Sequence, residues 1–249
     1  MTDVAQRTVL VVGASSGIGR AIALTLAEDG LNVVVFARRP ERLALVRAEI
    51  EDNGGQALAV SGDATQPEDL ERAVADSIAA FGRLDVVVNC AGTNAPNRAL
   101  RDIDPATWNR LIDVNLTASF HVTRTVSAAF RAQRSGLIVH IASTAARFPD
   151  GSGVAYQAAK AGVAALAFAT QVEEGPNGVR VSVIYPGLTD TDLVTQRPTP
   201  PDPDELRWAL QPEDVAAVCR HIVSLPAHVH LSEVVVRPFR VAATAEEGR

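Results

Sequence analysis

Tyr156 and Lys160 stand four residues apart in a helical pattern, so their side chains point to the same face of one helix. A phenol has an ordinary pKa of about 10, which is too high for easy proton transfer at neutral pH. A nearby ammonium group favours the phenolate and lowers that pKa. Tyr156 is therefore a candidate for giving a proton to a carbonyl oxygen, or for taking one from an alcohol.

Two other polar residues stand where such chemistry could use them. Ser143 follows an apolar run that predicts a strand, and a hydroxyl there can hold a substrate oxygen in place. Asn115 falls in the middle of a helical pattern, although asparagine is a poor helix former. Taken singly, each residue is ambiguous, and Tyr-x-x-x-Lys alone is more typical of an ordinary amphipathic helix turn.

A glycine-rich turn, Gly13-Ala14-Ser15-Ser16-Gly17-Ile18-Gly19, directly follows the first apolar run and opens a helix. Glycines let the backbone approach a pyrophosphate, and the free amides of a helix N-terminus bind its charge. The alternative is a turn that only reverses the chain, and three glycines alone do not decide between the two. The position between the first strand and its helix favours cofactor binding.

The second apolar run ends in Phe36-Ala37-Arg38-Arg39. An acidic residue here would bind a ribose hydroxyl and favour NAD, whereas a guanidinium suits a 2′-phosphate. Ala37 and Arg38 therefore predict NADP(H) as the preferred cofactor, with NAD(H) as the alternative. Arg39 could equally be a solvated residue at the start of the next helix.

Apolar runs and helical patterns alternate along the whole chain. The expected strands are Thr8–Val12, Asn32–Ala37, Ala57–Val60, Leu84–Val88, Gly136–Ala142, Val179–Ile184 and Glu233–Arg237. The expected helices are Gly17–Glu28, Pro40–Asp52, Pro67–Phe81, Pro105–Arg134, Ser152–Glu173 and Pro212 to Leu225. This order predicts an α/β, doubly wound Rossmann-type fold with a seven-stranded parallel sheet and helices on both faces. One domain is expected over residues 1–249, ending in a frayed tail at about 240–249.

The segment Arg197–Asp204 holds four prolines and two aspartates, which predicts an extended, exposed and stiff loop. The residues that follow the strand ends should form the substrate wall, and they include no obvious carboxylate clamp apart from Arg98 or Arg147.

Composition excludes several classes of function. The net charge of −6 disfavours nucleic-acid binding, and the apolar runs are shorter than the roughly 20 residues of a membrane helix. No leader pattern is present, so a cytoplasmic location is expected.

Cys90 and Cys219 are predicted to be small, buried hydrophobic residues. His228 and His230 have a spacing that a metal could use, but no acidic or cysteine partner stands near them, so no metal is expected.

The glycine spacing G-x-x-x-G-x-G resembles that of the short-chain dehydrogenase/reductase family in its single-domain form. Asn89-Cys90-Ala91-Gly92 resembles the family's Asn-Asn-Ala-Gly motif, from which Cys90 departs. Asp63 matches the adenine-contacting aspartate, and the segment from Pro186 to Thr191 resembles the one that holds the nicotinamide carboxamide. The catalytic set of the family is matched in order by Asn115, Ser143, Tyr156 and Lys160.

This resemblance implies hydride transfer between a nicotinamide cofactor and a small carbonyl or alcohol substrate, in a homodimer or homotetramer. It also implies that Asn115 holds a water linking Lys160 to solvent, and that the loop Asp192–Asp204 is the variable substrate lid. Because that loop looks short and stiff, the expected pocket is fairly open. The implied cofactor-binding residues are Gly13, Ser15, Ser16, Gly17, Ile18, Gly19, Arg38, Arg39, Asp63, Ala64, Asn89, Ala91, Gly92, Tyr156, Lys160, Pro186, Gly187, Thr189 and Thr191.

Two alternatives stay open at this point. An epimerase or dehydratase of the extended branch of the superfamily would have a different glycine spacing and a sizeable C-terminal substrate domain. A non-catalytic cofactor-binding or scaffold protein on the same fold would typically lack the tyrosine or the lysine, and this chain keeps both.

Overall fold

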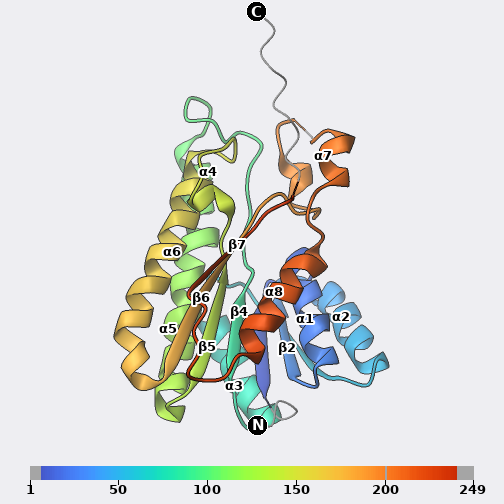
Figure 1. Ribbon diagram of the computed structural model, residues 1–249, viewed down its shortest axis with the longest axis vertical. Coiled ribbons are helices and arrows are strands. Elements are labelled where there is room, and N and C mark those ends of the chain that lie inside the picture. Colours follow the sequence, from blue (N-terminus) through green and yellow to red (C-terminus); the bar gives the residue numbers. More distant parts are fainter. Residues whose placement is uncertain (1–6, 200, 240–249) are drawn as a thin grey trace, which may run out of the picture.

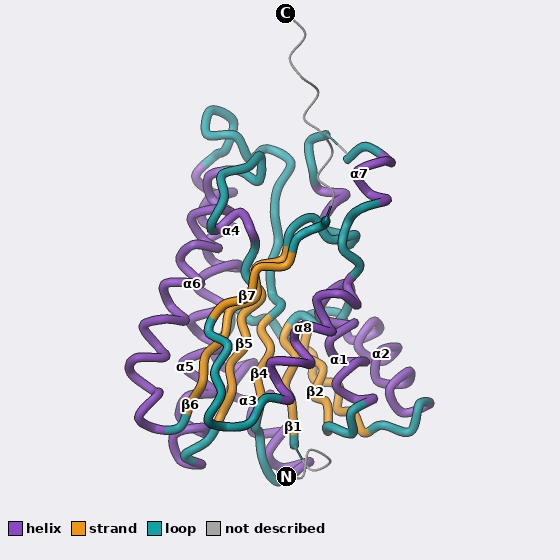
Figure 2. The backbone as a smooth tube through the Cα atoms, viewed as in Figure 1, coloured by secondary structure: helices purple, strands orange, loops and turns teal. Residues whose placement is uncertain are grey.

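A computed structural model of the protein describes residues 7–199 and 201–239. Seven parallel strands form one sheet in the order β3-β2-β1-β4-β5-β6-β7 (Figures 1 and 2). The strands are β1 (Thr8–Val12), β2 (Asn32–Ala37), β3 (Gln56–Ser61), β4 (Val86–Asn89), β5 (Gly136–Ile141), β6 (Val179–Pro186) and β7 (Glu233–Val236). The predicted fold class is confirmed, and the strand bounds differ by a few residues at most.

Helices cover both faces of the sheet, as Figure 1 shows. They are α1 (Gly17–Glu28), α2 (Pro40–Asp52), α3 (Pro67–Phe81), α4 (Pro105–Ile112), α5 (Ala118–Gln133), α6 (Val154–Glu174), α7 (Pro203–Arg207) and α8 (Pro212–Ser224). One buried cluster joins α1, α2 and α8 to the sheet, and a second joins α3, α5 and α6 to its other face.

The central strand β1 shows why this sequence forms such a sheet. Val9 and Val11 pack in the first cluster, while Leu10 and Val12 pack in the second, and all four are at most 1% exposed. A parallel strand covered on both sides needs apolar residues at every position rather than at alternate ones. The strand order reverses between β1 and β4, and ligands of such sheets bind outside the carboxyl ends of the strands at this point.

The long helix expected over Pro105–Arg134 is interrupted, so that prediction is wrong in its middle. A π-helical turn, Asp113–Thr117, separates α4 from α5. Asn115 lies in this turn, and its Nδ2 donates to the carbonyl oxygens of Leu111 at 2.8 Å and Thr93 at 2.9 Å. The apolar spacing continues through the turn, so periodicity does not reveal the interruption, whereas π turns of this kind occur frequently at functional sites.

The proline-rich segment Arg197–Asp204 is also not a uniformly extended loop. Its last residues start α7, with the Asp202 side chain accepting a hydrogen bond from the Asp204 amide and Pro203 at the first position. An acidic cap followed by proline also begins α4, where Asp104 precedes Pro105. The tail expected to fray, Ala242–Arg249, lies outside the described residues.

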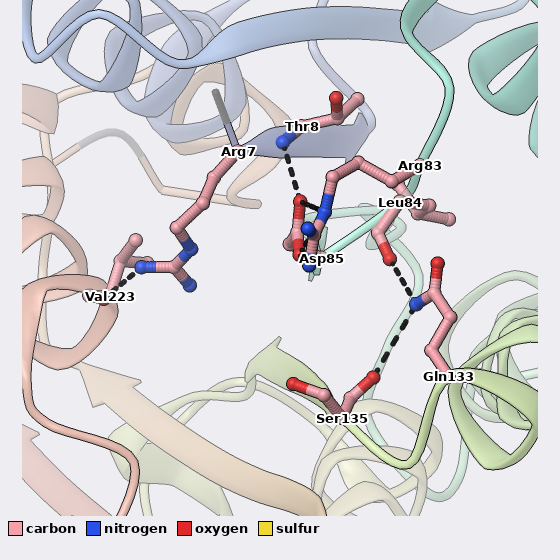
Figure 3. Close-up of polar contacts among 8 residues, drawn as sticks. All are labelled: Arg7, Thr8, Arg83, Leu84, Asp85, Gln133, Ser135 and Val223. Carbon is pink, nitrogen blue, oxygen red and sulfur yellow. Dashed lines mark hydrogen bonds and ion pairs between the residues drawn. The ribbon is translucent and has the colours of Figure 1, made fainter. Parts of the chain in front are cut away.

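The amino ends of the strands are closed by a polar network (Figure 3). The Asp85 carboxylate accepts the Thr8 amide at 2.9 Å and also bonds the Arg83 guanidinium, with a shortest distance of 2.6 Å. Gln133 on α5 donates to the Leu84 carbonyl at 2.7 Å. Within residues 7–199 and 201–239, no helix combines the length and apolarity that crossing a membrane requires.

Candidate active site

A cleft with a cavity volume of about 460 Å³ runs along the carboxyl ends of β1 to β5. It brings together the glycine turn, the arginine pair and the tyrosine–lysine pair, which lie far apart in the sequence. The predicted cofactor residues that line it are Gly13, Ser15, Ser16, Gly17, Ile18, Gly19, Arg38, Arg39, Asp63, Ala64, Ala91, Gly92, Tyr156, Lys160 and Thr191. Asn89, Pro186, Gly187 and Thr189 do not line it.

The glycine turn is shaped by two close backbone approaches. Gly13 has a φ of +84°, and a Cβ at this position would lie 2.9 Å from the carbonyl carbon of Cys90. A Cβ at Gly19 would collide with the Gly13 carbonyl oxygen, so only glycine lets α1 begin this close to β1. The Ser16 side chain forms no capping bond, so the first-turn amides and the helix dipole are left for an anion such as a pyrophosphate.

The two arginines after β2 form the positive end of the cleft. Both are exposed, and Arg39 Nη2 donates to Ser15 Oγ of the glycine turn at 3.1 Å. Arg39 is therefore held at the cleft, which the sequence alone left open. Arg38 lines the cleft without a hydrogen bond or ion pair to any described side chain.

Tyr156 and Lys160 form the other end of the cleft. Both come from the first turns of α6 and are buried, at 8% and 4% exposure. Lys160 Nζ lies 5.7 Å from the centre of the Tyr156 ring and donates to the Ile141 carbonyl at 3.1 Å. A Cβ at Gly92 would lie 3.3 Å from Lys160 Nζ and 3.1 Å from Asn115 Oδ1, so the lysine and the asparagine approach each other across this glycine.

The electrostatics of this pair differ from the sequence expectation. Burial raises the pKa of Tyr156 to about 12, a hydrogen bond with the Ser143 hydroxyl partly opposes this increase, and Lys160 is not among the groups that shift it. Burial also lowers the pKa of Lys160 to about 8. For the protein's own groups, the raised pKa of Tyr156 is opposite to the expected lowering, because desolvation of the phenolate is the largest contribution.

Ser143 and Asn115 support the pair in different ways. Ser143 is half-buried, its hydroxyl faces the Tyr156 phenol, and its Oγ accepts the Ala145 amide at 3.2 Å. Asn115 is fully buried, and besides its two donated bonds its Oδ1 accepts the Thr93 amide at 3.1 Å. The Asn115 side chain thus fixes the loop after β4 beside Lys160, and the water-holding role stays a prediction.

Asn89 is the last residue of β4, and Cys90 follows it. Asn89 is buried, and it donates to Ser119 Oγ at 2.9 Å and accepts the Ala91 amide at 3.2 Å, so it shapes the strand end from below. Cys90, expected to be a buried hydrophobe, is half-buried and lines the cleft. Burial raises the pKa of its thiol to about 12. Cys219 is buried as expected.

Sequence reasoning missed several residues of the cleft. Two of them follow a strand end that had already been recognised, and one comes from helix α4, which only the tertiary fold brings here. They are Gly62, Thr65 and Arg110. Asp192, Leu193 and Gln196 also line the cleft, and they belong to the loop that the resemblance assigns to the substrate lid. The rule that ligands bind at the carboxyl ends of strands could have indicated Gly62 and Thr65.

A second cavity has a volume of about 470 Å³, and the lid contributes to both cavities, since Gln196 lines the first and the adjacent Arg197 lines the second. Gly187, assigned by resemblance to the nicotinamide segment, lines this second cavity. Among the described residues, no group of three or more histidine, cysteine or acidic side chains could hold a metal ion. His230 Nε2 instead lies at hydrogen-bond distance, 2.9 Å, from the Val181 carbonyl oxygen.

Comparisons with known proteins agree with this geometry. The family model described as short chain dehydrogenase matches residues 7–201. A 3-oxoacyl-[acyl-carrier-protein] reductase of Synechocystis sp. is 35% identical over 235 residues, which cover 93% of this chain and 95% of the relative. A metagenomic short-chain oxidoreductase solved in complex with NADP is 34% identical, with a TM-score of 0.80 and coverage of 94% and 97% of the two chains.

A variant of actinorhodin polyketide ketoreductase solved with NADPH has a TM-score of 0.86 at 28% identity and covers 96% of this chain and 98% of its own. The residues that the family model matches include the glycine turn, the arginine pair and the tyrosine–lysine pair. The chain belongs to the short-chain dehydrogenase family.

Proposed function

We propose that this protein is an NADP(H)-dependent oxidoreductase that interconverts a carbonyl, either a ketone or an aldehyde, and an alcohol by hydride transfer, with Tyr156 as general acid and base. The observation that carries the proposal is one cleft with a phosphate-binding turn at one end and a buried tyrosine–lysine pair at the other. A dinucleotide bound along this cleft would have its nicotinamide beside Tyr156 when its pyrophosphate contacts the Gly13–Gly19 turn.

The cleft fits NADP(H) better than NAD(H). Ala37 leaves no carboxylate at the end of β2, and the exposed guanidinium of Arg38 has no described partner to give up on binding a 2′-phosphate. Arg39 is held beside Ser15, next to the same position. The two solved relatives named above carry NADP or NADPH, which supports the same preference here.

When bound, the reduced cofactor supplies a hydride to the carbonyl carbon. Ser143 and Tyr156 hold the carbonyl oxygen by hydrogen bonds, and Tyr156 gives its phenolic proton to that oxygen as the C=O π bond breaks. One C–H bond and one O–H bond form, so the substrate gains two electrons and two hydrogens. The Lys160 ammonium, whose Nζ lies 5.7 Å from the centre of the Tyr156 ring, stabilises the resulting tyrosinate until a proton from solvent restores the phenol.

The raised pKa of Tyr156 determines its protonation state in the protein alone. With the pKa of Tyr156 at about 12, the phenol keeps its proton at neutral pH, and the protonated form is the one that a carbonyl reductase needs. Oxidation of an alcohol would need the phenolate, which burial disfavours in the protein alone.

A homo-oligomer, a dimer or a tetramer, is part of the proposal. Trp108, Phe120 and Val172 are 37%, 45% and 78% exposed on α4, α5 and α6, respectively. Large apolar side chains on neighbouring helices are typical of subunit contacts. Light scattering coupled to size-exclusion chromatography measures the state directly.

The test of the reaction is a panel of aldehydes and ketones with NADPH that carries deuterium on the transferred position. The expected product is an alcohol with one deuterium on the former carbonyl carbon, detected by mass spectrometry, and NADH should serve less well. Binding of NADPH without turnover of any carbonyl compound would instead favour the non-catalytic, cofactor-binding scaffold.

A further inference from the structure

The second cavity is unusually rich in charged side chains. Three arginines line it, Arg98, Arg197 and Arg237, together with the carboxylates Asp150 and Glu205. None of the five forms an ion pair with any other described residue, whereas Arg101 nearby does so with Asp102. The lining therefore presents a net positive charge that no described protein group neutralises by direct contact.

Arg98 is the central member of this set. It is only 7% exposed, its Nη2 donates to the Gln196 carbonyl oxygen at 2.7 Å, and its Nε is buried without a partner. Its Nη1 has no hydrogen bond to the described part of the chain either. Burying a guanidinium without a carboxylate costs free energy, so an unpaired, buried arginine in a cavity needs a functional explanation.

The neighbourhood of Arg98 makes this cost larger. Burial lowers the pKa of Arg98, and the positive charge of Arg197 lowers it further, while Asp150 opposes both. Two guanidinium groups that face one cavity repel each other unless an anion lies between them.

The loop that carries Arg98 is held in place by close packing and by hydrogen bonds. A Cβ at Gly153, whose φ is +90°, would lie 2.6 Å from Arg98 Cβ, so glycine makes room for the arginine stem. Asn94 Nδ2 donates to the Ser152 carbonyl oxygen at 3.1 Å, which ties the same loop to the segment before α6. The backbone amide of Asn94 donates to Gln196 Oε1 at 3.3 Å, which ties the loop to the lid. Such support fixes a binding group in place before the ligand arrives.

Arg147, the other arginine that the sequence indicated, is already paired within the protein and is not free to bind a ligand. Its Nη2 donates to the Tyr185 hydroxyl at 3.0 Å, it forms an ion pair with Glu233, and its guanidinium stacks 5.0 Å from the centre of the Tyr185 ring. Arg98, by contrast, lies close enough to Tyr156 for the charge of each to affect the other.

We infer that the substrate carries a carboxylate, which Arg98 binds with help from Arg197 while the carbonyl of the substrate faces Tyr156. This inference rests on the proposed function and adds the class of substrate to it. A carboxylate fits better than a phosphate, because Asp150 and Glu205 leave the cavity with only a small positive excess that a dianion would overshoot. The planar guanidinium fork also matches a carboxylate in shape.

The test compares acids with their neutral methyl esters as substrates for NADPH-dependent reduction. Succinic semialdehyde and acetoacetate, each with its methyl ester, give two matched pairs that differ in charge and by one methyl group. The wild type should prefer the acid in kcat/KM, and Arg98→Gln should lower the acid-to-ester ratio at least about tenfold, because a charge-assisted bond is lost. Arg98→Lys should restore part of the ratio, and Arg197→Gln should lower it about threefold, since that side chain is half-buried and better solvated.

Arg101→Gln is the matched control, because it removes the same charge from the same loop at a side chain that is 88% exposed and outside the cavity. It should leave the ratio unchanged. Equal use of acids and esters by the wild type would overturn the inference and leave the proposed function standing. An equal loss for acid and ester in Arg98→Gln would also overturn it, because a purely structural role predicts that result.

A binding measurement decides the question without turnover. Butyrate and its neutral analogue butyramide are titrated by calorimetry into the protein with NADPH bound. Butyrate should bind more tightly to the wild type, and Arg98→Gln should abolish the difference. If no carbonyl compound is reduced, the proposed function fails, yet tight butyrate binding would still support the carboxylate site. Equal affinities for butyrate and butyramide, or a clear preference for inorganic phosphate, would overturn it.

Discussion

The two ends of the sheet differ in whether their polar groups are paired within the protein. At the amino end, Asp85 accepts bonds from the Thr8 amide and from Arg83, and Gln133 donates to the Leu84 carbonyl (Figure 3). At the carboxyl end, the first-turn amides of α1 are uncapped, and Arg38 has no described partner. Polar groups that are paired within the protein hold the fold together, whereas groups left unpaired in a cleft are available to a ligand.

We therefore expect substitutions at the two ends of the sheet to have different effects. Substitutions at the amino end should lower the free energy of unfolding and leave chemistry alone. Substitutions of cleft residues at the carboxyl end should lower activity or ligand affinity and leave the free energy of unfolding nearly unchanged, because natural sites accept locally unsatisfied groups in exchange for binding.

The largest effect is expected at the carboxyl end, for Tyr156→Phe. Removing the phenolic proton donor should lower kcat with NADPH by at least about a thousandfold. The free energy of unfolding in urea should change by less than about 1 kcal/mol, and NADPH should still bind. The chain's other tyrosine provides the control: Tyr185→Phe loses hydrogen bonds to Arg147 and Glu233, so it should lose stability but keep turnover. Most of the activity surviving in Tyr156→Phe would refute the assigned role.

At the amino end, Asp85→Ala should lower the free energy of unfolding by about 3 kcal/mol, because it leaves the Thr8 amide and the Arg83 guanidinium without their shared acceptor. The affinity of the folded protein for NADPH should not change. Asp102→Ala, which removes an ion pair between exposed side chains, should cost less than about 0.5 kcal/mol in the same urea titration. A loss of cofactor affinity in folded Asp85→Ala would break the comparison between the two ends.

The next largest effect concerns Arg38, which has no partner among the described residues. Arg38→Asp should lower the ratio of kcat/KM with NADPH to that with NADH by about a hundredfold, since an attraction for the 2′-phosphate becomes a repulsion. Steady-state kinetics with both cofactors measure this ratio, and Arg47→Asp on the outer part of α2 is a control of equal charge change. If the wild type uses NADH as well as NADPH, the proposed preference is wrong.

The smallest expected effect concerns a buried histidine at the carboxyl end of the sheet and the pH dependence of stability. His140 is fully buried beneath the cleft, where Thr123 Oγ1 lies 3.1 Å from its Nε2, and burial lowers its pKa to about 4. The unfolded chain, with a histidine pKa near 6.5, takes up this proton first as the pH falls. Stability from the neutral histidine is therefore full above pH 6.5 and decreases as the pH falls towards 4.

Between pH 6.5 and about pH 5 the loss should reach roughly 1–2 kcal/mol in the wild type. Urea titrations across this range should show a flatter dependence for His140→Gln than for the wild type. His228→Gln, on an exposed loop, should keep the wild-type slope. An unchanged slope in His140→Gln would mean that other groups govern acid sensitivity here.

The sequence by itself determined the fold class and most of the cleft. Runs such as Thr8–Val12, apolar at every position, specify a buried parallel strand, and the Gly13–Gly19 turn specifies where a phosphate can approach. These features are local, so spacing and residue type are enough to read them. The chemical pair Tyr156 and Lys160 is also local, because it lies on one helix face.

Only the tertiary structure decided the features that depend on distant neighbours. The π turn at Asn115 needs the Thr93 loop to bond with it, and the high pKa of Tyr156 depends on burial that no spacing reveals. The different surroundings of Arg98 and Arg147 have the same origin, since Glu233 on β7 forms an ion pair with Arg147, whereas Arg98 Nε is buried without a partner. Desolvation and pairing are set by what packs around a side chain, and that is a property of the folded chain.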